Sequence, residues 1–260
     1  MYSLGSLWKG VKNPRLAVRE LNSLYHTRLG RRGFYPHGTA VAEEDWDNLI
    51  ILDACRYDTF EQHHTLDGTL GSRLSRGSAT PEFLRGNFGD GTFHDTVYVS
   101  SNPFLEVHDY SGTFHDIINV WKEEGWNDEY GTVLPETVNE YAEQAAEQHP
   151  EKRLIAHFMQ PHHPFLTDET PFDRRHAVPD TGIWDRILAG DIDVDRERIR
   201  RLYRENLERV MGPVTELVQE LDGKTVVTSD HGNLFGERSF PIPVREWGHP
   251  GGLYLEPLLK

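Results

Sequence analysis

The sequence contains a single cysteine, few lysines and no long apolar run. Cys55 cannot form an intrachain disulfide or a cysteine-rich zinc site, so any bound metal must be held by histidine and carboxylate side chains. The longest uncharged apolar stretches, such as residues 49–52, are far shorter than the roughly 20 residues of a membrane-spanning helix. Residues 1–10 lack the continuous apolar core and the cleavage site of a secretory signal. We therefore expect a cytoplasmic protein without a transmembrane helix.

The shortage of lysine accompanies an excess of acidic residues. The chain has 42 acidic and 27 basic residues, only six of which are Lys, and its net charge is −15. Such a composition is typical of proteins that work in molar salt, where screening makes self-repulsion tolerable, and it predicts a halophilic source. The alternative is an ordinary acidic cytoplasmic protein that uses Arg in place of Lys. In both cases nucleic acid is not expected as a partner.

The first 32 residues differ in charge from the rest of the chain. They contain seven basic residues and one acidic residue, a net charge of +6, which leaves −21 for the remainder. Apolar residues recur every three to four positions from Leu4 to Tyr25, as in an amphipathic helix. A basic amphipathic segment can lie on an anionic membrane surface, or it can pack on its own core or on a partner subunit. We therefore expect two parts, the segment 1–32 and a single domain at 33–260.

From residue 47 onward, patterns of buried strands alternate with helical patterns. Four apolar or β-branched runs predict strands at 48–53, 96–100, 153–158 and 224–229, and helical spacing predicts helices at 135–148 and 195–221. The alternation predicts an α/β sandwich around a mostly parallel sheet, in which ligands bind outside the carboxyl ends of the strands. The Asp- and Pro-rich stretch 167–195 is typical of a surface excursion.

Two of the predicted strands end in residues that can bind a metal. Asp53 ends the first strand, and Asp230 and His231 follow the last one. Gly232 allows a sharp turn there, so that both neighbouring side chains can face the same point. Oxygen and imidazole ligands without thiolate suit Mn, Zn, Mg or Ca. We therefore predict one divalent metal ion at this edge of the sheet.

The sequences around these residues resemble the alkaline phosphatase superfamily, particularly its sulfatase-like branch of haloarchaeal type. The resemblance lies in Asn48–Asp58, Met159–Phe165, Val226–Glu237 and Gly248–Gly252, in that order along the chain. It implies the alkaline-phosphatase-like three-layer sandwich of this family. It also implies a metal-dependent ester hydrolase or transferase, with Asp53, Asp230 and His231 as metal ligands.

The family uses a nucleophile that also contacts the metal, on a loop before a helix. Gly77–Phe83 is the stretch that fits, and it offers Ser78 and Thr80. A hydroxyl group at a helix N-terminus near a divalent cation has its alkoxide form favoured by both charges. In one branch of the family the nucleophile lies four residues before a Glu-Phe pair, and that spacing favours Ser78 as nucleophile and metal ligand. Thr80 remains the alternative, and a plain helix cap without chemistry is the other interpretation.

One departure from the sulfatases decides which ester we expect. Their formylglycine arises within Cys/Ser-x-Pro-x-Arg, and neither Cys55 nor Ser78 is followed by that pattern. A plain hydroxyl nucleophile suits a phosphate ester, so we predict a phosphatase, phosphodiesterase or phosphotransferase. Two alternatives remain, namely a sulfatase with an atypical nucleophile and a non-catalytic module that binds a metal or a ligand.

The remaining candidate residues would handle the substrate. His162 is a candidate either to protonate the leaving oxygen or to hold a nonbridging oxygen, because an imidazole ordinarily titrates near neutrality. Arg56 and Arg76 are candidate phosphate clamps, with ordinary surface ion pairs as the alternative. By resemblance His163 and His249 are candidate substrate ligands, and His249 is alternatively the start of a second metal site. The expected substrate is a small-molecule, lipid-linked or glycan-linked phosphoester, and the basic segment 1–32 suggests peripheral contact with a membrane.

Overall fold

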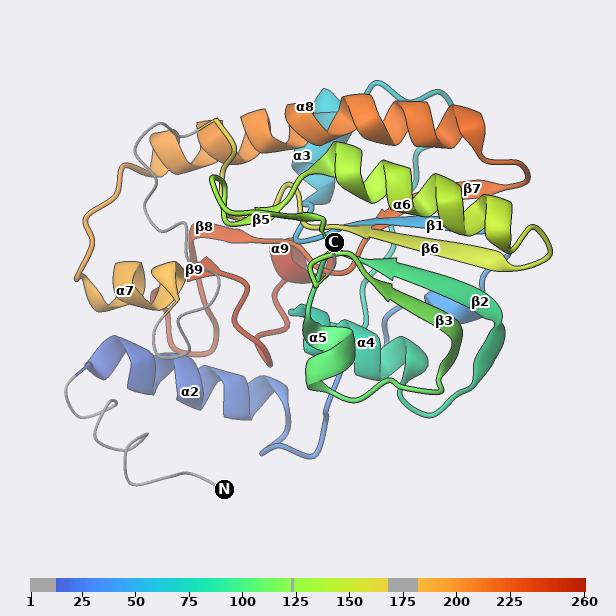
Figure 1. Cartoon of the computed structure of the whole chain (residues 1–260). Coiled ribbons are helices and arrows are strands. Elements are labelled where there is room, and N and C mark those ends of the chain that lie inside the picture. The colour runs from blue at the N-terminus through green and yellow to red at the C-terminus, as the bar shows by residue number, and fades with distance from the viewer. Residues whose placement is uncertain (1–12, 123, 168–181) are drawn as a thin grey trace.

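The computed structural model describes residues 13–122, 124–167 and 182–260, and its centre is a parallel sheet of five strands (Figure 1). The strand order is β3 (Phe114–Asn119), β2 (Phe93–Ser100), β6 (Arg153–Phe158), β1 (Asn48–Leu52) and β7 (Thr225–Ser229). Two antiparallel pairs accompany it, β4 (Trp126–Asn127) with β5 (Thr132–Val133) and β8 (Leu234–Arg238) with β9 (Arg245–Gly248). The helices are α2 (Pro14–His26), η1 (Val41–Glu43), α3 (Tyr57–His63), α4 (Thr80–Phe88), α5 (Phe104–Val107), α6 (Pro135–Gln148), α7 (Ile183–Ala189), α8 (Arg196–Glu220) and α9 (Glu256–Leu259).

The two faces of the sheet bury different side chains, as the alternation of a strand requires. Ile50 and Leu52 face α6 and α8, which contribute a long apolar stripe that includes Leu207 and Val214. Leu49 and Ile51 face the other layer, which contains α4 and α5. Figure 1 shows α6 and α8 on one side of the sheet and α4 and α5 on the other. The predicted α/β sandwich around a parallel sheet is confirmed.

Two of the predicted elements are confirmed with their bounds. The strand predicted at 153–158 matches β6, and the helix predicted at 135–148 matches α6, each with the predicted bounds. Asp195 is the N-cap of α8 rather than its first residue, because its carboxylate accepts a hydrogen bond from the amide of Glu197. Pro213 lies inside α8.

The stretch 167–195 is only partly described, and the described part corrects the prediction of a surface excursion. Residues 168–181 lie outside the described residues. Helix α7 follows them and buries Ile183, Ile187 and Leu188. The prediction was wrong for α7, because the Asp and Pro content around it obscured a short apolar helical stripe. Strand β3 was not predicted, since its first half carries the exposed pair His115 and Asp116.

Helix α2 lies within the basic segment 1–32 and is anchored to the rest of the protein. Arg19 pairs with Asp185 of α7 at 2.6 Å and with the buried Glu246 of β9 at 2.7 Å. This side of α2 packs on the chain's own core, while Leu21 and Tyr25 on α2 remain 54% exposed. In the part of the chain that the structure describes, no helix combines the length and apolar character that crossing a bilayer requires.

The aromatic packing beneath α4 predicts a large cost for a cavity there. Phe88 is 1% exposed and contacts the rings of Phe93, Tyr98 and Phe114. We expect Phe88→Ala to lower the free energy of unfolding by about 3–5 kcal/mol in urea denaturation. The control Val107→Ala removes a side chain that is 65% exposed, and we expect a change within about 0.5 kcal/mol. Equal effects of the two substitutions would contradict the packing described here.

Candidate metal centre and nucleophile

Three buried residues at the carboxyl ends of neighbouring strands form the candidate metal centre. Asp53 follows β1, Asp230 follows β7, and His157 is the penultimate residue of β6. The strands lie side by side in parallel, with Leu52 opposite Ser229 and Ile51 opposite His157. One ligand atom from each of the three side chains lies within 4.8 Å of the others, so the group could hold a metal ion.

The backbone around Asp230 holds its carboxylate in place. Oδ1 accepts hydrogen bonds from the amides of Ala54 at 3.0 Å and His231 at 2.8 Å. Ala54 adopts a left-handed conformation with φ 60°, and its carbonyl accepts a hydrogen bond from the Tyr203 hydroxyl. The Ser75 hydroxyl donates to the carbonyl of Asp230. The turn after β1 and the turn after β7 are therefore fixed to each other.

Two atoms at the centre lack a hydrogen-bond partner within the described structure. Asp53 Oδ2 accepts a hydrogen bond from Asn102 at 2.7 Å, but Asp53 Oδ1 has none. His157 Nδ1 bonds to the Tyr98 hydroxyl at 2.9 Å, while its Nε2 is without a partner. That nitrogen lies 4.0 Å from Asp53 and 3.9 Å from Asp230. Buried polar atoms are nearly always satisfied, so these two atoms support a bound cation.

His231 is oriented as metal-binding histidines usually are. Its Nδ1 lies 2.8 Å from the carbonyl oxygen of Gly232, so Nδ1 carries the proton and donates it there. Nε2 is then a lone-pair donor, 3.6 Å from Asp53 Oδ1 and 3.3 Å from Asp230 Oδ2. The predicted ligands Asp53, Asp230 and His231 are thus close together. His157 joins them from β6, which lies next to β1 on the side away from β7.

The electrostatics of the centre favour a cation. Burial and the neighbouring charge of Asp230 raise the pKa of Asp53 well above its usual range. Burial lowers the pKa of His157 to about 4, so this ring is neutral near pH 7 and cannot offset the carboxylates. Among the described residues, no Lys or Arg forms an ion pair with Asp53 or Asp230. A divalent ion would supply the missing positive charge.

Thr80, rather than Ser78, presents its hydroxyl to the centre. Thr80 is the first residue of α4, and its Oγ1 donates to Asp230 Oδ2 at 2.7 Å and lies 3.3 Å from His231 Nε2. The Ser78 hydroxyl instead donates to Glu82 at 2.8 Å and lies 3.2 Å from the carbonyl of Pro250. Glu82 also accepts from the Ser78 amide, so this pair closes the N-terminus of α4. Neither hydroxyl is the N-cap, a position that Ala79 occupies.

Two of the predicted substrate histidines lie beside the centre. His162 Nε2 and His249 Nε2 are 2.7 Å apart, and the His249 ring centroid lies 4.6 Å from that of His231. Burial and the nearby His231 lower the pKa of His249 well below its usual range. As whole residues, His162 and His249 are half-buried, whereas Asp53, Asp230 and His231 are buried. His163 turns elsewhere and packs on Phe165 and Trp184.

The two candidate phosphate clamps have other partners. Arg56 binds both carboxylate oxygens of Asp58 and pairs with Glu237 at 3.0 Å. Arg76 donates to the carbonyls of Gly38 and Gly86. These contacts give both guanidinium groups a structural role.

Cys55 is 5% exposed, and burial raises the pKa of its thiol, which makes it a poor nucleophile.

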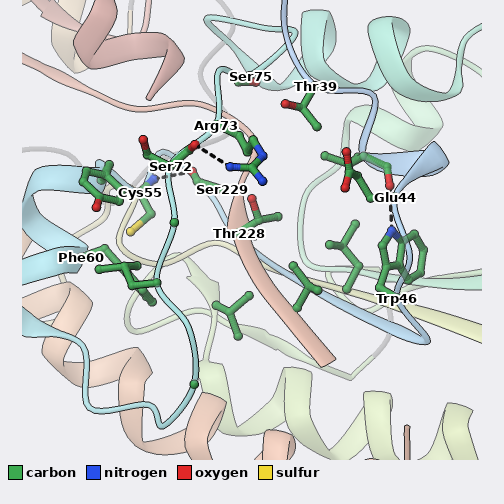
Figure 2. A pocket seen from close by; sticks show the side chains of 18 of the residues that line it. Thr39, Glu44, Trp46, Cys55, Phe60, Ser72, Arg73, Ser75, Thr228 and Ser229 are labelled. Carbon is green, nitrogen blue, oxygen red and sulfur yellow. Dashed lines mark hydrogen bonds between the residues drawn. The ribbon is translucent and has the colours of Figure 1, made fainter. Parts of the chain in front are cut away.

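A cavity of about 600 Å³ lies close to the centre. It runs along the outer edge of β7, opposite the extended stretch 66–75, and Figure 2 shows Arg73 and Thr228 among the side chains around it. His231 contributes to its wall, whereas Asp53, Thr80 and Asp230 do not. The side of the centre that faces His249 is therefore the better approach for a substrate.

Comparison with known proteins gives no relative for this chain. No protein-family model, curated protein or solved structure matches it.

Sequence reasoning missed three residues of the site. His157 lies in an apolar strand and looks like a core residue; its position one residue before the strand end was the available signal. Asn102, which orients Asp53, lies two residues beyond β2 at the same edge of the sheet. Tyr98 contacts His157 from β2 and carries no signal in the sequence beyond its place in a strand.

Metal titration of single variants would identify the ligands. We expect the wild-type chain to bind about one Mn or Zn ion, and Asp230→Asn and His231→Ala to weaken binding by at least about 100-fold in equilibrium dialysis. His157→Ala separates a three-residue from a four-residue site, and a loss of similar size assigns His157 as a ligand. His115→Ala, an exposed histidine on β3, is the matched control. Unchanged affinity in Asp230→Asn would contradict the assignment.

The raised pKa of Asp53 predicts how the metal-free protein responds to pH. A carboxyl group whose pKa is higher in the folded state favours folding when protonated, and this contribution disappears as pH rises from about 4 through the folded pKa. In chelator we therefore expect Asp53→Asn to have a higher melting temperature than the wild type at pH 7, with a smaller difference near pH 4. Added metal should reverse the order at pH 7, because only the wild type binds it. A less stable Asp53→Asn in chelator at pH 7 would contradict this account.

Proposed function

We propose that this protein is a metal-dependent hydrolase or transferase that acts on a phosphate ester through Thr80. The observation that carries the proposal is the position of the Thr80 hydroxyl, 2.7 Å from Asp230 and 3.3 Å from His231 in a buried centre of metal-binding type. Ser78 is the less suitable nucleophile, since Glu82 and Pro250 occupy its hydroxyl. The resemblance of the sequence to the alkaline phosphatase superfamily agrees with this class of reaction.

Three features of its surroundings support Thr80 as the nucleophile. Its proton lies on a hydrogen bond to Asp230 Oδ2, which is the acceptor when the oxygen attacks. The N-terminus of α4 adds partial positive charge at the same position. A divalent cation held by Asp53, Asp230 and His231, with His157 as a further candidate, would polarise a phosphoryl oxygen and favour the alkoxide.

The reaction then consists of two displacements. Thr80 Oγ1 forms a bond to phosphorus while the bond from phosphorus to the leaving oxygen breaks. That oxygen takes a proton from the imidazolium form of His162, which becomes a neutral ring bonded to His249. Water or an acceptor alcohol next attacks the phosphothreonine and returns its proton to the histidine pair. The bond to Thr80 breaks, and Asp230 gives the proton back to Oγ1. We propose a small-molecule, lipid-linked or glycan-linked phosphoester as the substrate.

The test is hydrolysis of p-nitrophenyl phosphate and bis-p-nitrophenyl phosphate with Mn, Zn, Mg or Ca, compared with chelator. We expect metal-dependent cleavage, and we expect Thr80→Ala to lower kcat by about 1,000-fold or more. Ser78→Ala is the matched control, since it removes a neighbouring hydroxyl that does not face the centre; we expect it to keep kcat within about tenfold. A larger loss in Ser78→Ala than in Thr80→Ala would contradict the assignment of the nucleophile.

Cleavage of p-nitrophenyl sulfate in preference to the phosphates would instead favour a sulfatase. Metal binding without turnover of these esters or of lipid-linked and glycan-linked phosphoesters would favour a non-catalytic module.

A further inference from the structure

The connection between β8 and β9 has an apolar tip with arginines at its base. Phe240 is 57% exposed and Ile242 is 42% exposed, and Pro241 and Pro243 alternate with them. Arg238 and Arg245 are opposite each other in the register of the two strands, and both are exposed. This arrangement places each of two large apolar residues within three positions of an arginine along the chain.

The outer side of α2 continues this apolar tip. The ring of Tyr25 meets that of Phe240 edge to face at 5.7 Å, and Leu21 lies one helical turn before Tyr25. Leu29, just beyond the helix, is 76% exposed. Of the nine exposed large apolar side chains among the described residues, five therefore belong to α2 and its flank or to the hairpin tip. We call these five residues the α2–hairpin surface: Leu21, Tyr25, Leu29, Phe240 and Ile242.

Buried hydrogen bonds fix the two halves of this surface to each other. Asn22 is fully buried, and its amide nitrogen donates to Ser239 Oγ at 2.9 Å and to the carbonyl of Ile242 at 2.8 Å. The amide of Ile242 donates back to Asn22 Oδ1 at 2.9 Å. His26 Nε2 lies 2.9 Å from the carbonyl of Phe240. Hydrogen bonds from Asn22 and His26 thus hold the hairpin tip in a position where Phe240 and Ile242 remain exposed to solvent.

Five exposed arginines and one exposed acidic residue, Glu20, lie on α2, its flank and the hairpin. Arg28 and Arg31 follow α2 and are exposed, next to Leu29. Arg15, Arg238 and Arg245 line a cavity of about 560 Å³ between α7 and the hairpin, where Asp193 is the one acidic residue of the wall. In the described part of the chain, none of these five arginines forms an ion pair with a carboxylate. This face is basic in a chain whose net charge is −15.

We propose that the α2–hairpin surface docks on an anionic lipid bilayer. The exposed apolar side chains would enter the interface between headgroups and acyl chains, and the arginines would contact headgroup phosphates. Charge complementarity favours this partner, because the arginines attract anionic headgroups. The remaining acidic surface is repelled by the same membrane, so only this face can approach it. A second copy is disfavoured, since a two-fold contact through the same surface would bring two sets of unpaired arginines together. The inference does not depend on the proposed function.

Vesicle sedimentation of the full-length chain tests this proposal. We expect binding to vesicles of phosphatidylcholine mixed with phosphatidylglycerol and little binding to phosphatidylcholine alone. Arg238→Gln with Arg245→Gln, and separately Phe240→Ser with Ile242→Ser, should each lower the partition coefficient by about tenfold or more. Raising KCl from about 0.1 M to about 1 M should weaken the wild type and leave the apolar contribution, because the Debye length falls from about 10 Å to about 3 Å.

Matched controls separate this surface from general stickiness. Arg73→Gln and Val107→Ser remove an exposed arginine and an exposed apolar side chain elsewhere, and both should bind as the wild type does. Circular dichroism checks that each variant folds. If the variant with Phe240→Ser and Ile242→Ser does not fold, the variant with Arg238→Gln and Arg245→Gln still tests the proposal. Equal binding to both vesicle types, or wild-type binding by the folded surface variants, would overturn the proposal. So would a lipid-free dimer that Phe240→Ser abolishes, because it would assign the surface to a second copy.

Discussion

The burial of two carboxylates on adjacent parallel strands is the constraint on which the site depends. Asp53 and Asp230 are 2% and 0% exposed, and their strands place them side by side without a neighbouring Lys or Arg among the described residues. Two buried like charges are costly, and the neutral His157 cannot compensate them. Hydrogen bonds from Ala54, Asn102 and Thr80 to the two carboxylates each reduce the free-energy cost of burying them.

The sheet edge was predictable because it depends on short apolar runs. Strands β1, β6 and β7 show in the sequence as short apolar or β-branched runs, and their parallel arrangement brings Asp53 and Asp230 to the same edge of the sheet. The choice between Ser78 and Thr80 was not predictable in this way. It depends on Glu82, which turns back to bind the Ser78 hydroxyl, a tertiary detail that spacing along the chain does not reveal. The family resemblance, the halophilic source and the cytoplasmic location remain predictions from the sequence.

The same hairpin connects the candidate site to the proposed membrane contact. Strand β8 begins shortly after His231, and β9 ends next to His249, while the tip between the strands carries Phe240 and the flanking arginines. The four residues of β9 span roughly 13 Å at about 3.3 Å per residue. A headgroup that protrudes from a bilayer bound at the hairpin tip would therefore have to span a distance of this order to reach the site. Each proposal has its own test, so either can fail without the other.

The most direct test of the account is a crystal structure with Mn, with diffraction recorded at the metal absorption edge. We predict a single strong anomalous peak within about 2.0–2.6 Å of oxygens from Asp53 and Asp230 and of His231 Nε2, with the Thr80 hydroxyl facing the ion. The presence or absence of His157 Nε2 among the ligands would fix the composition of the site. A centre that contains no peak in crystals soaked with Mn, or a Thr80 hydroxyl turned away from the ion, would contradict the account.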